Sequence, residues 1–503
     1  MASDWPPAGG AAEETARPRL ATVLNDSQLR AETDRRNTSQ NGISHLARMS
    51  MDVLPDDALN FAGMRSQLRP GLTLLLCFHI VACCLSLIYV AAFYSGYHIV
   101  WFDQTRLYAA ALSVTPFAIV AVVLTFSRFS IGYFVGFYSY TMILGYLWLA
   151  AFSQFHYNHT LASVSAFVSA LAFLAPALFI TAPIRQRFVL SARALDHLLS
   201  LILIFGTAII AIGALYNFRL VGIAEIYSFR GALEFPALLN YVIGATSNAL
   251  LPFAFACFVS RGDPWRATAA LLLLLLFYPI MLTKLALFAP FWLLFIALLS
   301  RFFEARTTVV LSLLLPLSAG VILALLFKSG VLPGAYFATY FGAINFRMIA
   351  FPSIAVDIYN DFFSTHSLTY FCQISFLKPL VACPYSEALA VVMAKAYQVG
   401  NLNASLFATE GIASVGPLLA PLAVFACGLV IALGNRLSAG LPPRFILISG
   451  ALLPHILLNV ALTITLLTYG AAALFLLWYI TPRAMFEQPL RSPSPHPSCH
   501  QQA

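Results

Sequence analysis

The first apolar stretch of the chain, LTLLLCFHIVACCLSLIYVAAFY (residues 72–94), contains no Lys, Arg, Asp or Glu. A helix needs about 20 such residues to cross the hydrocarbon core of a bilayer, so this stretch predicts a transmembrane helix. Similar windows recur along the chain, at 108–126, 131–152, 162–181, 197–216, 238–259, 267–282, 285–300, 308–327, 412–433, 445–461 and 464–481. Together they predict an all-α polytopic integral membrane protein with about 12 transmembrane helices.

The composition excludes a soluble globular protein. Of the 503 residues, 60% are hydrophobic and 10% are charged, whereas soluble domains are about 45–50% apolar and about 25% charged. The mean hydropathy of +0.83 agrees. Two junctions, around Thr283–Lys284 and around Asn459, are very short. Each pair of windows there is compatible with a hairpin, a re-entrant element or one long tilted helix.

The distribution of Lys and Arg predicts the orientation, because cytoplasmic loops carry an excess of both. With the N-terminus inside, residues 1–71 hold 8 of the 28 and the later cytoplasmic segments hold 12, which leaves 8 outside. We therefore expect a disordered Arg-rich cytoplasmic tail (1–70), a transmembrane domain (71–482) and a cytoplasmic C-terminal tail (483–503). The net charge of +8 reflects this bias and favours membrane lipids over nucleic acid as partners.

The longest segment between two windows, residues 328–411, is predicted to be a large periplasmic loop with short helices, and it concentrates ionisable residues. Such a concentration favours a site over simple solvation. Arg347 follows the stretch GAYFATYFGAINF and precedes MIAFP, so we expect it at the membrane interface. Two interpretations are open. Arg347 binds a phosphate with its planar fork, or it pairs with Asp357 or Asp361 and closes the loop.

Two residues of this loop are candidate general bases. Glu410 directly precedes the window 412–433. It either deprotonates a sugar hydroxyl or stabilises a helix start through the helix dipole. His366 is the other candidate, because an imidazole needs little tuning to act near neutral pH.

Basic residues outside this loop are candidates for phosphate binding. The second-longest outer loop, 219–236, brings Tyr227 and Arg230 to the membrane surface. Arg230 either binds a phosphate or forms a weak surface pair with Glu234. Lys284, between two apolar runs, either binds a phosphate or extends to the lipid headgroups.

The cysteines predict no metal site. Five of the eight lie in apolar windows and one in the C-terminal tail, and no CxxC, HExxH or His/Cys cluster occurs. Cys372 and Cys383 share the large outer loop, where an oxidising compartment would permit a disulfide. Their spacing neither demands nor excludes one.

Several segments resemble the bacterial O-antigen polymerase group, also called oligosaccharide repeat-unit polymerases. The resemblance lies in pattern more than in a rigid motif and covers about residues 210–480. The segments that carry it are LTKLALFAPFWLL (282–294), FRMIAFPSIAVDIYNDFF (346–363), NLNASLFATEGIASVGPLLAP (401–421) and NVALTITLLTYG (459–470). The chain departs from the group in its long Arg-rich N-terminal tail and its short loop 219–236.

The resemblance implies a multi-pass glycosyltransferase of the cell inner membrane that polymerises lipid-linked oligosaccharide repeats at the periplasmic face, for O-antigen or exopolysaccharide. The donor would be a polyprenyl pyrophosphate, no cofactor would be needed, and a flippase and a chain-length regulator would be partners. In the implied site, Arg347 and Arg230 hold pyrophosphate, Lys284 assists, and Tyr359, Asp361 and Glu410 line the cavity. The alternatives are an O-antigen ligase and a secondary transporter. Because transporters need discontinuous helices and polar groups at the bilayer midplane, ionisable residues in loops favour an enzyme.

Overall fold

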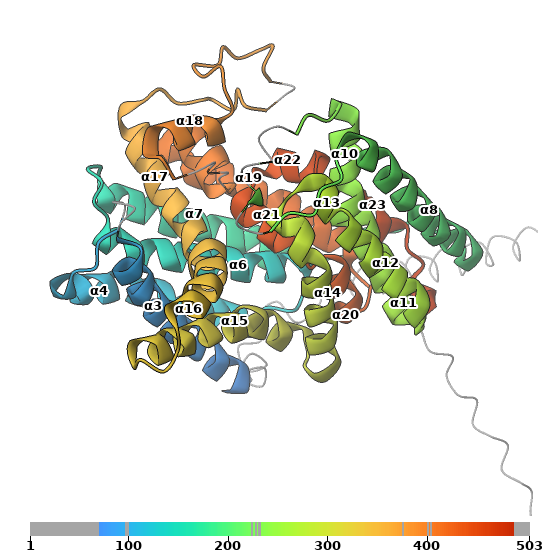
Figure 1. The fold of residues 1–503 in the computed structure, drawn as a ribbon, viewed down its shortest axis with the longest axis horizontal. Helices are drawn as coiled ribbons and strands as arrows, with labels where there is room; N and C mark the ends of the chain where they lie inside the picture. The colour runs from blue at the N-terminus through green and yellow to red at the C-terminus, as the bar shows by residue number, and fades with distance from the viewer. Residues whose placement is uncertain are drawn as a thin grey trace, which may run out of the picture. The chain divides into compact units, whose positions relative to one another are not determined.

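The computed structural model describes residues 70–95, 100–222, 225–226, 229, 233–374, 377–399, 402 and 405–486. These residues belong to one contact unit, residues 68–503. Every regular element among them is a helix (Figure 1), and the only extended pairing in this part of the chain is one bridge between Val100 and Ser153. The predicted all-α polytopic fold class is confirmed.

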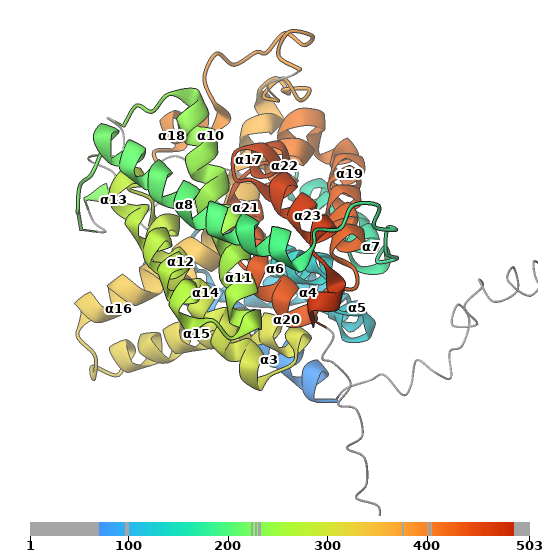
Figure 2. The same ribbon diagram turned by 90° about the vertical axis from the view of Figure 1, so that its right-hand side faces the viewer.

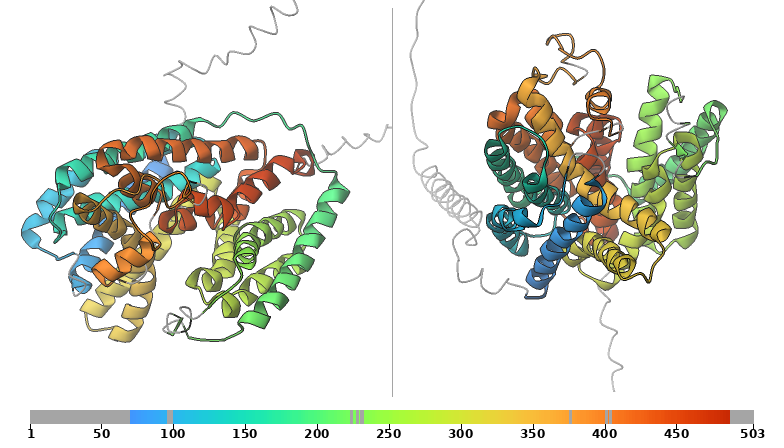
Figure 3. Two further views of the ribbon diagram at one scale, coloured as in Figure 1. Left: turned by 90° about the horizontal axis from the view of Figure 1, so that it is seen from above. Right: turned by 60° about the vertical axis from the view of Figure 1, so that its left-hand side comes forward.

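Eleven helical stretches of the described residues are long and apolar enough to cross a membrane. Ten coincide with predicted windows: α3 (Pro70–Phe93), η3–α5 (Gln104–Phe126), α6–η4 (Ile131–Phe152), α7 (His159–Phe179), α8 (Ala192–Tyr216), α10–α11 (Ala237–Arg261), α12–α13 (Pro264–Met281), α14 (Lys284–Phe302), α15 (Ala305–Lys328) and η7–α19 (Phe407–Ser438). The junction at Thr283–Lys284 is a tight turn, with Leu282 in the left-handed conformation (φ 46°). Helices α8 and α10–α14 pack on one another and form the green group of Figures 2 and 3.

Three of the helices contain a π-helical segment shortly before a proline. The segments are η5 (Thr246–Leu250) before Pro252, η6 (Gly342–Ala350) before Pro352, and η7 (Phe407–Ala413) before Pro417. A proline removes one backbone donor and clashes with the preceding turn. A wider turn of the π type accommodates that clash without ending the helix.

The eleventh apolar stretch, Gly334–Thr365, is a continuous helix made of α16 (Gly334–Phe341), η6 and α17 (Phe351–Thr365). It begins where Phe337 stacks on Phe327, at the end of α15. Near its middle the Ser353 hydroxyl donates to Met142 O of α6. Towards its end Asp357 contacts Tyr157, in the loop after α6.

Both ends of this helix therefore lie on the side of the bundle where α3, α6 and α15 end, which we call the loop face. The edge-on contact between the rings of Phe93 and Phe327 and the backbone bond from Trp101 N to Phe152 O place those helix ends together. The expectation of a loop with only short helices over 328–411 is corrected in this respect. Residues 334–365 enter the bundle as a long oblique helix, and the loop proper follows them, with α18 (Leu389–Tyr397).

The last two predicted windows form four short helices: α20 (Pro443–Ser449), α21 (Leu453–Asn459), α22 (Leu462–Leu467) and α23 (Ala471–Ile480). The chain is interrupted at Gly450, after Asn459 and at Gly470, whose φ is +73°. None of these helices is long enough to span a bilayer alone. The final pair of windows is therefore a discontinuous element.

Helix α6 (Ile131–Leu149) is buried along its whole length, and a single side chain joins it to two neighbours. Asn435 of α19 accepts a hydrogen bond from Gly132 N (2.6 Å) and donates to Ala177 O (2.8 Å) and Ile180 O (3.2 Å). Gly132 N lies in the first turn of α6 and has no acceptor within that helix. Ala177 O and Ile180 O lie at the end of α7 and have no donor within that helix. Asn435 therefore caps two helix ends at once.

We expect Asn435→Ala to lower the thermal stability of the purified protein in detergent. Each buried backbone group left without a partner costs about 1–3 kcal/mol. Asn240→Ala is the matched control, because Asn240 is exposed and makes one long bond of 3.4 Å. Equal melting temperatures for the two variants would contradict the capping role.

Candidate functional site

Two carboxylates lie one helical turn apart at the loop-face end of α17. Asp357 is 1% exposed and accepts a hydrogen bond from the hydroxyl of Tyr157, which lies 3.2 Å from the hydroxyl of Tyr146. Asp361 is partly exposed, and its Oδ2 accepts from the hydroxyl of Tyr397 (2.7 Å). We call these five residues the acid–tyrosine cluster.

Both loop tyrosines of the cluster are held as hydrogen-bond donors. Burial raises the pKa of Tyr157, and so does the nearby charge of Asp357. Burial likewise raises the pKa of Tyr397, as does its hydrogen bond to Asp361. The two phenols therefore remain protonated at neutral pH and donate to the carboxylates. The ring of Phe155 lies against Tyr397 at 5.4 Å between centroids, which leaves an aromatic wall beside Asp361.

Glu410 lies in the π-helical segment η7 and is 7% exposed. Its Oε1 accepts from Leu462 N (2.8 Å), at the start of α22, and its Oε2 accepts from the Thr409 hydroxyl (2.7 Å). These are the contacts of a capping carboxylate, although the capped helix is α22 and not the one that Glu410 precedes. Tyr359 lies within electrostatic reach, and its buried hydroxyl has no partner among the described residues. Catalysis by Glu410 stays a prediction.

The isosteric change Glu410→Gln separates the two roles. A Gln carbonyl still accepts from Leu462 N, so we expect the variant to fold and to retain its turnover. A general base typically contributes about 10²–10⁴ in rate, so a loss of that size would contradict a purely capping role. The measurement is turnover of the purified protein in lipid across a range of pH, with Glu410→Ala as the control that removes the cap.

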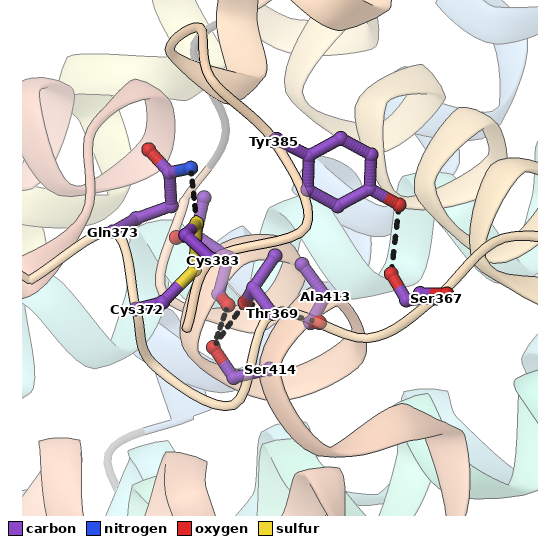
Figure 4. Close-up of a disulfide and its surroundings, with 9 residues drawn as sticks. Ser367, Thr369, Cys372, Gln373, Cys383, Tyr385, Ala413 and Ser414 are labelled. Atoms are coloured by element: carbon purple, nitrogen blue, oxygen red, sulfur yellow. Dashed lines mark hydrogen bonds between the residues drawn. A yellow bond between two sulfur atoms is a disulfide. The ribbon is translucent and has the colours of Figure 1, made fainter. Parts of the chain in front are cut away.

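A disulfide closes the loop that follows α17. Cys372 and Cys383 are joined, which answers the question that their spacing left open (Figure 4). The same loop is fastened to the segment after Glu410, because Thr369 N donates to Ala413 O (2.8 Å) and Tyr370 N to Ser414 O (3.1 Å). The loop therefore has a fixed position beside the two carboxylate sites.

The remaining predicted site residues come from separate segments of the chain. Arg347 is partly buried in η6, with its guanidinium 3.8 Å from the centroid of the Phe351 ring. It precedes Asp361 by about 20 Å of helical rise at 1.5 Å per residue. Lys284 is the first residue of α14 and is partly buried. His366 follows α17, where its Nδ1 contacts Phe362 O (2.9 Å) and its ring stacks on that residue's ring. Tyr227 and Arg230 lie outside the described residues.

A small cavity of about 200 Å³ lies at the end of α8, beside the second outer loop. Arg219 lines it together with Glu234, and its guanidinium lies 5.6 Å from the centroid of the Phe229 ring. The sequence predicts Arg230 as the phosphate-binding residue of this loop and does not predict Arg219. The only sequence signal for Arg219 is its position just after the predicted transmembrane helix 197–216. Tyr146, Tyr157 and Tyr397 were also missed.

Comparisons with known proteins do not identify the site. No family model, curated protein or solved structure matches this chain. Within the described part of the chain, no group of three or more His, Cys, Asp or Glu side chains gathers in a way that could hold a metal ion.

Proposed function

We propose that this chain is a membrane-embedded glycosyltransferase that polymerises lipid-linked oligosaccharide repeats. One observation carries the proposal. A single continuous helix bears a partly buried Arg347 and, about 20 Å further along, the partly exposed carboxylate of Asp361. An acceptor repeat has a pyrophosphate at one end and an attacking hydroxyl several sugars away. Arg347 would bind the first, and Asp361 would receive the proton of the second.

The reaction would run without a cofactor. The acceptor hydroxyl oxygen attacks C1 of the donor sugar while the bond from C1 to the pyrophosphate oxygen breaks. The proton moves to Asp361, and the departing pyrophosphate takes the electron pair and is stabilised by cations. Because both substrates carry a pyrophosphate, two phosphate-binding places are required. Lys284 lies on a separate helix from Arg347 and, with Arg219 and Arg230, is the candidate for the second.

The loop face is proposed to face the periplasm of the cell inner membrane, with both termini cytoplasmic. The disulfide between Cys372 and Cys383 supports this orientation, because disulfides persist in oxidising compartments. A reporter fused after Ser364 should therefore be active on the periplasmic side, and one after Arg266 should be cytoplasmic. A cytoplasmic signal at Ser364 would exclude the proposed reaction at this site.

The direct test uses purified protein in lipid with a polyprenyl pyrophosphate oligosaccharide as the only substrate. We expect a ladder of lipid-linked products that grows by one repeat at a time. Product formed only when a lipid A core acceptor is added would instead identify the ligase alternative. A partner flippase or chain-length regulator would change the supply of substrate or the length of the ladder, not its existence.

A secondary transporter is the second candidate, and one observation favours it. Helices α20–α23 are discontinuous, and the buried Glu410 caps one of the breaks, as in transporters whose sites lie at interrupted helices. The chain therefore does contain discontinuous helices, one of the two features that transporters need. Uptake of labelled oligosaccharide into vesicles with no growth of the lipid-linked product would decide for this alternative.

A further inference from the structure

A row of buried polar side chains runs along the interface of α3, α6 and α15 and ends beside the acid–tyrosine cluster. Its members are bonded in pairs that join different helices: His79 with Thr141, Tyr138 with Ser312, and Asn345 with Ser86. The helices that supply them are apolar enough to cross a membrane. Paired hydroxyl and amide groups are common between membrane helices, but an ionisable residue inside a membrane, here His79, is a candidate for a functional site.

The row contains acceptor atoms that have no hydrogen-bond partner among the residues that the structure describes. The Thr141 hydroxyl donates to Phe137 O (3.0 Å), so its oxygen accepts from His79 Nε2 (2.9 Å). His79 therefore carries its proton on Nε2, and its Nδ1 is an open acceptor. That atom is buried without a partner, and so is Asn345 Oδ1, in residues that are both 0% exposed. Buried acceptors of this kind are normally satisfied by internal water.

The row has an ionisable group near each of its ends. Towards the loop face, Ser353 packs against Gly145 of α6, one turn before Asp357 and next to Tyr146. Towards the opposite face, the buried hydroxyl of Tyr133 has no partner in the described part of the chain and lies within electrostatic reach of Arg306 and Glu304. Successive polar positions on α6, at 133, 138, 141 and 146, are separated by about 4.5–7.5 Å of helical rise. One or two water molecules would be needed to bridge such gaps.

We propose that this row is a proton path through the bundle, with His79 as its proton-carrying side chain. A protonated water gives its extra proton to the open Nδ1, which breaks an O–H bond and forms an N–H bond. Nδ1 then gives a proton to the next water along the row, which breaks that N–H bond and forms a new O–H bond. His455 lies on another side of Tyr138, with ring centroids 5.0 Å apart and its own Nε2 buried without a partner. It offers a second relay position beside the row. The path does not depend on glycosyl transfer.

The test is proton flux into vesicles of phosphatidylcholine and phosphatidylglycerol that contain the purified full-length protein. A potassium gradient with valinomycin sets the membrane potential, and trapped pyranine reports the internal pH. We expect wild-type flux above that of protein-free vesicles. His79→Gln should reduce the flux to the protein-free level. Tyr138→Phe, which keeps the ring and removes only the hydroxyl, should reduce it as well.

His197→Gln is the matched control, because His197 is exposed on α8 and lies outside the row. It should conduct like the wild type. The proposal is overturned if wild-type protein conducts no better than protein-free vesicles, or if both row variants conduct like the wild type. It is also overturned if His197→Gln loses as much flux as His79→Gln. No substrate is present, so failure of this test says nothing about glycan polymerisation, and the reverse also holds.

Discussion

Arg347→Ala is expected to abolish extension of the lipid-linked glycan while the folded protein remains in the membrane. Arg347 is proposed to anchor the acceptor pyrophosphate, and loss of such an anchor misplaces a reacting hydroxyl some 20 Å away. A misplacement of about 1 Å can cost about 10²-fold in rate. Arg347→Lys should restore little, because a point charge does not reproduce the planar bidentate fork. The measurement is the ladder of products formed by purified protein in lipid.

The matched control for this prediction is Arg106→Ala. Arg106 also lies at the loop face, where it is exposed and paired with Asp103 at 3.5 Å, a contact that contributes little. We expect its product ladder to match that of the wild type. Long products from Arg347→Ala would exclude the anchoring role. A loss of folded protein in that variant would instead favour a structural role for its packing against Phe351.

The second large effect is expected for Asp361→Asn. The amide cannot accept the proton of the attacking hydroxyl, so turnover should fall by about 10²–10⁴, the usual contribution of a general base. Tyr397 can still donate to the Asn carbonyl, so the hydrogen bond that positions the side chain is kept. Single repeats should therefore accumulate on an enzyme of normal stability, as measured by melting in detergent.

Glu387→Gln is the matched control for Asp361→Asn. Glu387 belongs to the same loop, is exposed, and pairs with Lys395 at 2.6 Å in solvent. Neutralising it should leave turnover unchanged. If Asp361→Asn and Glu387→Gln both turn over like the wild type, Asp361 is not the base, and Asp357 and His366 become the next residues to test.

The spans were predictable because the bilayer imposes a length and a composition on each of them. The prediction failed where polar residues dilute an apolar segment. Asn345 and Arg347 interrupt the hydrophobic run of Gly334–Thr365, so the sequence alone predicts a loop there. In the last 40 residues of the domain, the hydropathy was high enough for two spans. The breaks at Gly450 and Gly470 were present in the sequence as glycines, but long-range contacts decide which glycines interrupt a helix.

The candidate site was predictable only where ionisable residues were scarce enough to stand out. Asp361 and Glu410 are candidates on this ground, and their roles stay predictions. Tyr157 and Tyr397 were missed because their contacts with Asp357 and Asp361 cross 200 and 36 positions of sequence. Tyrosine is common in membrane helices and interfaces, so its presence carried no signal. Leu462 contacts Glu410 through its backbone N–H. Because nearly every residue has this group, the residue type at 462 does not predict the contact.

The π-helical segment η6 has a consequence for insertions and deletions. A π turn holds one residue more than the α turn it replaces, so the chain can lose a residue there without breaking the helix. Everything on one side of the deletion would then rotate by about 100° relative to the other, since an α-helix turns once in 3.6 residues. Arg347 and Asp361 lie on opposite sides of the end of this segment. A one-residue deletion within Gly342–Phe346 would therefore rotate the segment before it, whereas one within Met348–Ala350 would rotate Arg347 relative to Asp361. The extra residue of the π turn therefore sets the rotation of the first part of this helix relative to the second part.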